Sequence, residues 1–162
     1  MPGSAVPAPA EEEEAVAPPA VPWWSRWWVR VLAIFLASRV VTTVILLIFA
    51  ANQGKNPWTG AHPDYFSYAT IWDGLWYNIV AGWGYPSSLP SADGLHVTEN
   101  AWAFLPGYPW LVDAVMFVTR LPWSPAAVLV SLACAAGAAL VFYRLMLRVG
   151  LGTSTSLFAV VL

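Results

Sequence analysis

The feature that most constrains this chain is an apolar stretch at residues 31–51, broken only by Ser38, Arg39 and two threonines. A helix that crosses a lipid bilayer needs about 20 predominantly apolar residues, because the hydrocarbon core is about 30 Å thick. Four tryptophans and two arginines precede the stretch, at residues 23–30. Aromatic and basic side chains in this arrangement are typical of the cytoplasmic boundary of a membrane. We therefore expect residues 23–51 to form a first transmembrane helix with a cytoplasmic N-terminus.

The composition supports a membrane protein and excludes other classes. Of the 162 residues, 59% are hydrophobic and 10% are charged, whereas about a quarter of the residues of a soluble domain are charged. The net charge of −2 is due to Glu11 to Glu14, since the rest of the chain has seven basic residues against five acidic ones. These basic residues form no cluster of the kind that binds nucleic acid. With Cys134 as the single cysteine, this sequence forms no intrachain disulfide.

The chain divides into four parts. Residues 1–22 have the acidic, Pro/Ala-rich composition of a disordered tail. The first transmembrane helix follows, and residues 52–101 then form a polar, aromatic-rich loop on the extracytoplasmic side. Residues 102–162 predict further transmembrane helices, the clearest at residues 126–143 and the last one truncated. We expect an all-α, polytopic helical membrane protein of which this chain is the N-terminal part.

The number of crossings after the loop is in conflict with the charge pattern. If residues 102–119 and 126–143 both cross the bilayer, Arg144 and Arg148 lie on the outside. Basic residues are enriched on the cytoplasmic side instead. Either the Pro-containing segment around residues 102–119 enters the membrane without crossing it, or the two arginines serve something other than topology. Three crossings are preferred here. The position of the loop does not depend on this choice.

Residues 65–81 of the loop predict a helix that is too short and too polar to span. Its aromatic and apolar side chains fall on one face, at Trp72, Trp76, Ile79 and Trp83. Such a helix is expected to lie along the outer membrane surface and to end at the glycines of positions 82 and 84. Asp73 stands near its start. This aspartate is either the N-cap of the helix, a position that aspartate favours, or a reactive carboxylate.

The loop holds the side chains best suited to chemistry: His62, Asp64, Asp73, Asp93, His96 and Glu99. Their spacing does not indicate a metal site, and the sequence has no P-loop, Ser–His–acid pattern or dinucleotide-binding turn. Carboxylates beside aromatic rings at an outer membrane surface suit glycosyl transfer instead. A carboxylate takes a proton from the acceptor hydroxyl, and Trp and Tyr rings pack on sugar faces. A charge inside a span, such as Arg39, usually faces a partner, so Arg39 either pairs with an acid or binds a lipid phosphate.

Two blocks of the sequence carry a resemblance to a known family. They are residues 72–85 (WDGLWYNIVAGWGY) and residues 99–109 (ENAWAFLPGYP), in this order between the first two apolar spans. Together with Ser38 and Arg39 in the first span, they resemble the first-loop signature of the PIG-V-type mannosyltransferases, relatives of the second GPI mannosyltransferase in the GT-C superfamily. The resemblance covers about residues 30–150.

The resemblance implies an integral membrane mannosyltransferase that acts on the extracytoplasmic face, without nucleotide, cofactor or metal. Its donor is a polyprenyl-phosphate-linked mannose and its acceptor a glycan or glycolipid. By motif match, Asp73 is the catalytic base and Glu99 a second acid of the site. The implied substrate-binding residues are Arg39, Trp72, Trp76, Tyr77 and Tyr108. The missing C-terminal spans imply that the fragment is inactive in isolation.

Two alternatives remain beside this hypothesis. One is a non-catalytic polytopic protein, such as a transporter or an assembly subunit, although the sequence shows no internal repeat and only Arg39 and Asp113 as charges suited to a transport path. The other is a GT-C enzyme that uses another lipid-linked sugar, such as glucose or arabinose. The fold and the base would be the same in that enzyme, so the sequence separates it poorly from a mannosyltransferase.

Overall fold

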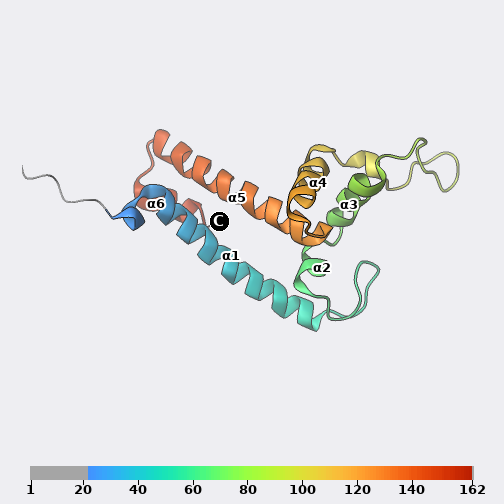
Figure 1. The fold of residues 1–162 in the computed structure, drawn as a ribbon, viewed down its shortest axis with the longest axis horizontal. Helices are drawn as coiled ribbons and strands as arrows, with labels where there is room; N and C mark the ends of the chain where they lie inside the picture. Colours follow the sequence, from blue (N-terminus) through green and yellow to red (C-terminus); the bar gives the residue numbers. More distant parts are fainter. Residues whose placement is uncertain (1–21, 162) are drawn as a thin grey trace, which may run out of the picture.

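The computed structural model describes residues 22–161, and the part of the predicted tail before Pro22 lies outside them. Within this range the regular structure is helical, with no strand (Figure 1), which confirms the all-α class. The elements are η1 (Trp23–Ser25), α1 (Trp27–Asn52), α2 (Tyr65–Ala69), α3 (Asp73–Trp83), η2 (Ala101–Ala103), α4 (Gly107–Thr119), α5 (Trp123–Arg148) and α6 (Thr153–Ala159).

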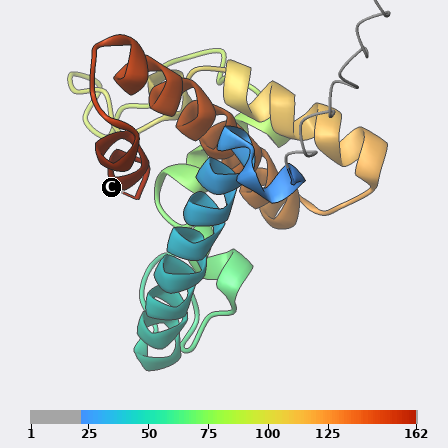
Figure 2. The ribbon, with the colours of Figure 1, turned by 90° about the vertical axis from the view of Figure 1, so that its left-hand side faces the viewer.

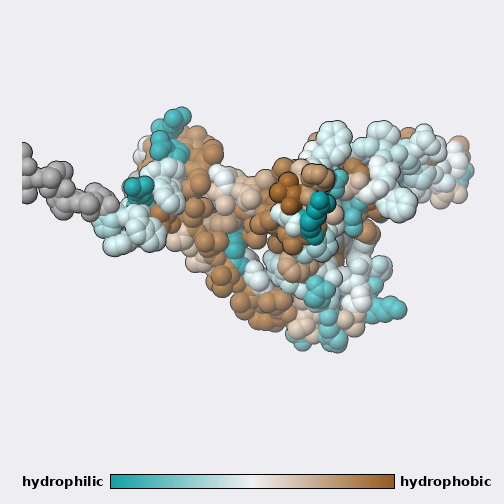
Figure 3. Space-filling model, in the orientation of Figure 1, coloured by the Kyte–Doolittle hydropathy of each residue, from teal (hydrophilic) through white to brown (hydrophobic). Residues whose placement is uncertain are grey.

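Two of these helices, α1 and α5, are long and apolar enough to cross a membrane. Each has 26 residues, which corresponds to about 39 Å of helix against a hydrocarbon core of about 30 Å. Most of their side chains are not buried inside the molecule, and Figure 3 shows apolar colours along the region where they lie. The helix α5 begins earlier than predicted, at Trp123. Pro125 is accommodated there because the first turn of a helix does not use its N–H groups.

The helices α1 and α5 run in opposite directions and pack where α1 begins and α5 ends (Figures 1 and 2). The Trp27 ring stacks on Tyr143 with 5.8 Å between centroids, and the Arg144 guanidinium lies over Trp27 at 5.1 Å. Val31 and Phe35 are buried beside Tyr143, and α6 closes this cluster through Val160. The start of α1 and the end of α5 therefore lie at one end of the molecule.

The helix α4 is shorter than the span predicted at residues 102–119. It has 13 residues, about 20 Å of helix, which is too short to span. It packs along the first turns of α5 instead, where Val112 is buried with Trp123, Ala126, Ala127 and Val130. The small alanine side chains allow the two backbones to approach closely. Arg144 and Arg148 share an end of the molecule with the start of α1.

The predicted helix at residues 65–81 is two helices, α2 and α3, separated by a turn. At the turn Trp72 has φ 54° and ψ −114°, and the Gly74 N–H donates to the carbonyl of Ile71 at 3.2 Å. A positive φ is incompatible with a continuous α-helix. The end of α3 agrees with the sequence, because Gly84 follows it with φ 72°.

The break also changes which face of α3 is buried. Tyr77, Val80 and Ala81 face the rest of the protein, and Tyr77 and Ala81 pack against the α4–α5 core. Trp72 lies outside the helix, and Trp83 is 89% exposed. The predicted aromatic stripe is therefore not a single face of a single helix, because the turn rotates its first member away from the others.

Candidate functional site

Asp73 lies at the start of α3 in a cleft that also contains the second predicted acid. The cleft has a volume of about 330 Å³. It is lined by Trp58, Trp72, Asp73, Trp76, Glu99, Asn100, Ala103 and Phe104, and is here called the carboxylate cleft. Four of the predicted site residues thus come together in it, although 26 positions separate Asp73 from Glu99 in the sequence. Trp76 forms one wall by stacking on Phe104, with centroids 5.9 Å apart.

The Asp73 carboxylate has no hydrogen bond or ion pair among the described residues. The predicted N-cap role is wrong, because Trp72 occupies the cap position and Asp73 is the first residue of the helix. The aspartate that does act as a cap is Asp64, which accepts hydrogen bonds from the backbone N–H groups of Phe66 and Ser67 at the start of α2. An acid in the first turn interacts favourably with the helix dipole. Asp73 is exposed and keeps both oxygens available for an external group.

Glu99 is placed by local contacts around η2. The Asn100 side chain accepts from the Trp102 N–H and caps this short helix. Trp102 stacks on Tyr85 at 4.4 Å, and Tyr85 donates through its hydroxyl to the carbonyl of Phe104 at 2.6 Å. These contacts bring the segment after the loop back against the end of α3. Glu99 is exposed and, within residues 22–161, has no hydrogen-bond partner, so the cleft holds two uncommitted carboxylates.

A second and larger cleft borders Asp73 on the side of α5. Its volume is about 620 Å³, and we call it the tyrosine cleft because Tyr65, Tyr77 and Tyr108 line it. The Tyr77 ring contacts Tyr108 edge-on at 5.1 Å. The Tyr108 hydroxyl lies 3.0 Å from the carbonyl oxygen of Ala127 and 2.9 Å from the Ser131 hydroxyl. Asp73 therefore lies between a polar cleft with tryptophan walls and a cleft that runs onto the apolar helix α5.

Arg39 is not part of either cleft. It lies halfway along α1, about 20 Å of helix from the end of α1 that leads into the loop. It lines a separate groove of about 700 Å³ formed mostly by apolar residues of α1, α5 and α6, here called the Arg39 groove. Its guanidinium lies over the Phe35 ring at 5.4 Å and donates to Ser38 at 3.4 Å. The lining of the two clefts beside Asp73 contains no lysine or arginine.

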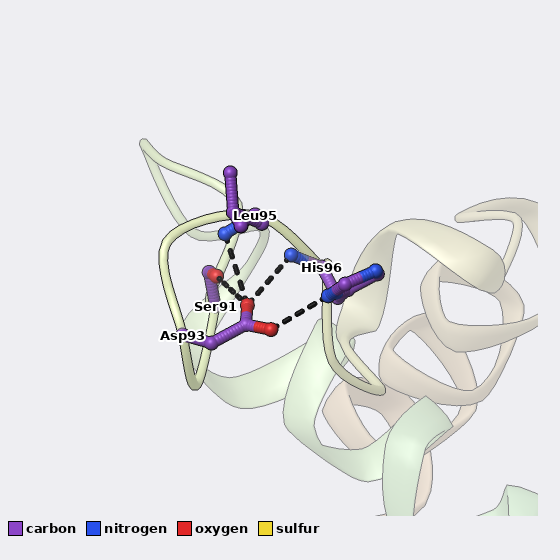
Figure 4. Close-up of polar contacts among 4 residues, drawn as sticks. All are labelled: Ser91, Asp93, Leu95 and His96. Atoms are coloured by element: carbon purple, nitrogen blue, oxygen red, sulfur yellow. Dashed lines mark hydrogen bonds and ion pairs between the residues drawn. The ribbon is translucent and has the colours of Figure 1, made fainter.

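The other acids of the loop serve local structure (Figure 4). The Asp93 carboxylate accepts from the backbone N–H groups of Leu95 and His96 at 2.9 and 2.7 Å, and lies 2.6 Å from the His96 Nδ1. The hydrogen bond to the His96 side chain, together with these backbone bonds, holds the pKa of Asp93 well below its usual range. The Ser67 hydroxyl and N–H lower the pKa of Asp64 in the same way. Residues 22–161 contain no group of three His, Cys, Asp or Glu side chains that could hold a metal ion.

Sequence reasoning missed several residues of the clefts, among them Trp58, Phe104 and Trp123. Trp58 completes the tryptophan wall of the carboxylate cleft. The sequence feature that could have indicated Trp58 is its position in the same aromatic-rich loop. Phe104 lies inside the second sequence block, where its aromatic character was visible but its partner was not. Trp123 lines the tyrosine cleft, is 8% exposed, and has a buried indole N–H without a partner in the described structure. Such a group is rare in proteins, and no sequence pattern indicates it.

The sequence and the structure were compared with known proteins. No family model matches the sequence, and no curated protein or solved structure gives a match. What the fold defines is an all-α protein with two helices long and apolar enough to cross a membrane. The family likeness rests on the two sequence blocks alone.

Proposed function

We propose that this protein is a membrane glycosyltransferase that moves mannose from a polyprenyl-phosphate-linked donor to a glycan or glycolipid acceptor. The observation that carries the proposal is the carboxylate cleft. It combines Asp73 and Glu99, both without a hydrogen-bond partner among residues 22–161, with the rings of Trp58, Trp72 and Trp76. Tryptophan rings offer flat apolar surfaces to sugars, and a carboxylate without a partner is free to accept a proton.

The orientation of the protein follows from its charge distribution. Arg26, Arg30, Arg144 and Arg148 all belong to the end of the molecule where α1 begins and α5 ends. Because basic residues favour the cytoplasmic side, we assign this end to the cytoplasm. The loop at residues 52–101 and both clefts beside Asp73 are then extracytoplasmic, where a lipid-linked sugar rather than a nucleotide sugar supplies the donor.

In the proposed reaction Asp73 is the general base. It takes the proton of an acceptor hydroxyl while the hydroxyl oxygen forms a bond to the anomeric carbon of the donor mannose. The bond between that carbon and the phosphate oxygen breaks, and its electron pair leaves with the polyprenyl phosphate. The proton on Asp73 then passes to water. A base of this kind contributes about 10²- to 10⁴-fold to a rate.

The two clefts suit different parts of the substrates. The tyrosine cleft includes Ala127, Val128 and Leu132 of α5 and therefore offers an apolar path for the polyprenyl chain. The phenol groups of Tyr65 and Tyr77 are hydrogen-bond donors for the phosphate, whereas the Tyr108 hydroxyl donates to the carbonyl of Ala127. The carboxylate cleft, with its tryptophans and Glu99, suits the acceptor sugar. The sequence resemblance implies that Arg39 contacts the donor phosphate. This contact stays a prediction, since Arg39 lines a groove that is separate from both clefts.

The test is a transfer assay with full-length protein in cell membranes and radiolabelled polyprenyl-phosphate mannose. Asp73→Asn is expected to reduce transfer by about 10²- to 10⁴-fold without changing membrane insertion, because the amide cannot take the proton. Glu99→Gln should reduce transfer by a smaller factor. Asp93→Asn is the matched control, since Asp93 is committed to its own loop, and transfer should be unchanged.

The outcomes separate the proposal from its alternatives. Transfer by Asp73→Asn at the wild-type rate would exclude Asp73 as the base. No transfer by the wild-type protein from a mannose donor, but transfer from a glucose or arabinose donor, would correct the sugar and keep the site. No transfer from any of these donors would favour a non-catalytic membrane protein.

A further inference from the structure

A groove with two arginines lies at the end of the molecule opposite to the clefts. It has a volume of about 410 Å³ and is lined by Trp27 of α1 and by Leu140, Val141, Arg144, Leu145 and Arg148 of α5. We call it the arginine groove. It lies where α1 begins and α5 ends, which is the depth at which the phosphates of a membrane leaflet meet a transmembrane helix. The proposed glycosyl transfer makes no use of it.

The charges of the groove are not neutralised within the described protein. Arg144 and Arg148 are one helical turn apart on α5, both are exposed, and neither forms an ion pair with a residue in the range 22–161. The ion pair found in that range is between His96 and Asp93, in the distant loop. Arg144 packs its guanidinium over the Trp27 ring at 5.1 Å, which fixes its position and leaves its N–H groups at the edge available to an anion.

Apart from the two arginines, the walls of the arginine groove are apolar. A site that binds only a free anion does not require apolar walls. Leu140, Val141 and Leu145 continue the lining away from the arginines. Val141 and Leu145 also line the Arg39 groove, whose other walls include Phe35 and Phe142. The two grooves meet at Val141 and Leu145, and together they offer a mostly apolar surface, interrupted by Arg39, that leads away from Arg144 and Arg148.

We propose that the arginine groove binds an anionic phospholipid of the cytoplasmic leaflet. Arg144 and Arg148 bind its phosphate, and one acyl chain lies along Val141 and Leu145 toward the Arg39 groove. Basic pockets between transmembrane helices on the cytoplasmic side bind anionic headgroups in this way. The inference depends on α1 and α5 spanning the membrane, and not on glycosyl transfer.

The experiment is native mass spectrometry of the purified full chain, which counts retained lipid molecules. Phosphatidylglycerol and phosphatidylcholine with identical acyl chains are compared, and phosphatidylglycerol should be retained preferentially. The double change Arg144→Gln and Arg148→Gln should reduce that preference about 25-fold, because each arginine near the phosphates contributes about fivefold. Arg120→Gln is the matched control. Arg120 also lies over an aromatic ring, Phe117 at 5.3 Å, but not in this groove.

A second variant tests the acyl part of the site. Val141→Trp fills the apolar wall and keeps both arginines, so it should lower phosphatidylglycerol retention while binding of glycerol phosphate, a headgroup without chains, stays unchanged. Equal retention of both lipids, or no effect of the double arginine change, would overturn the proposal. If glycerol phosphate displaces the lipid at equal concentration, the groove binds free anions and the lipid proposal is wrong. Lipid binding that requires Glu11 to Glu14 to be changed to glutamine would show that the acidic tail occupies the groove.

Discussion

Trp72 has a backbone conformation that tryptophan rarely adopts. Its φ of 54° and ψ of −114° match the second residue of a type II′ turn, a position that favours glycine. The Gly74 N–H that bonds to Ile71 closes this turn. The chain keeps a tryptophan here, and its ring is 62% exposed beside the carboxylate cleft. Strain of this kind, when held by the surrounding structure, is found at functional sites.

The strain predicts an order of stability for two variants. Trp72→Ala and Trp72→Gly remove the same ring, but only glycine adopts this φ without strain. We expect Trp72→Gly to be more stable than Trp72→Ala by about 1 kcal/mol after the greater chain entropy of glycine is allowed for. Thermal unfolding of the detergent-solubilised protein measures this difference. Equal melting temperatures would show that the turn carries no strain.

A second prediction at this scale concerns pH and the Asp93 turn. The pKa of Asp93 is lower in the folded loop than its usual value of 3.8. The turn is therefore fully stabilised above that usual value and loses this contribution as the pH falls through the folded pKa. Protection of the Leu95 and His96 amides against hydrogen exchange should fall below about pH 4. The Asp93→Asn variant should show no such acid dependence, and an equal fall in that variant would assign it to another group.

At the scale of elements, the contact between α4 and α5 holds the clefts in place. Tyr77 of α3 packs against the cluster that contains Val112 of α4 and Trp123 of α5. The tyrosine cleft therefore shares its walls with this core. Its packing depends on Ala126, which has no exposed surface, and on the close approach of helices that such a small residue allows.

This packing makes a prediction for Ala126. The change Ala126→Leu should destabilise the protein by about 1–3 kcal/mol, because the added atoms have no space between α4 and α5. Ala133→Leu, on an exposed part of the same helix, is the control and should change stability by less than about 0.5 kcal/mol. Thermal unfolding in detergent compares them. Equal effects would mean that α4 and α5 do not pack as described.

At the scale of the whole molecule, the antiparallel pair of α1 and α5 determines the topology. The stacked rings of Trp27 and Tyr143 join the start of one helix to the end of the other. In the proposed orientation, with both helices crossing a membrane, residues 25 and 149 lie on the same side and residue 87 of the loop lies on the other. The three-crossing topology puts residue 149 on the side of the loop instead.

Labelling of single cysteines decides between these topologies. In a Cys134→Ala background, Ser87→Cys should react with a membrane-impermeant maleimide in intact cells. Ser25→Cys and Val149→Cys should react only after the membrane is permeabilised, because the proposed orientation places both on the cytoplasmic side. Labelling of Val149→Cys in intact cells would contradict the pairing of α1 with α5 across the bilayer.

The sequence by itself determined the features that depend on local composition. Residues 31–51 and 126–143 are long and apolar. Such segments form helices in a membrane, because a helix satisfies its backbone hydrogen bonds internally. Gly84 marks the end of α3 because it accepts a positive φ without strain. The aromatic surroundings of Asp73 were likewise visible in its neighbours along the chain.

The tertiary structure decided the features that depend on distant segments. The break at Trp72 follows no local propensity, because tryptophan disfavours that conformation. Glu99 joins Asp73 only through the contacts of Tyr85, Trp102 and Phe104 that fold the loop back. Arg39 lines a groove with α5 and the end of α6 rather than either cleft because of how these helices pack. That α4 packs along the first turns of α5 is likewise a matter of tertiary packing, which periodicity alone does not encode.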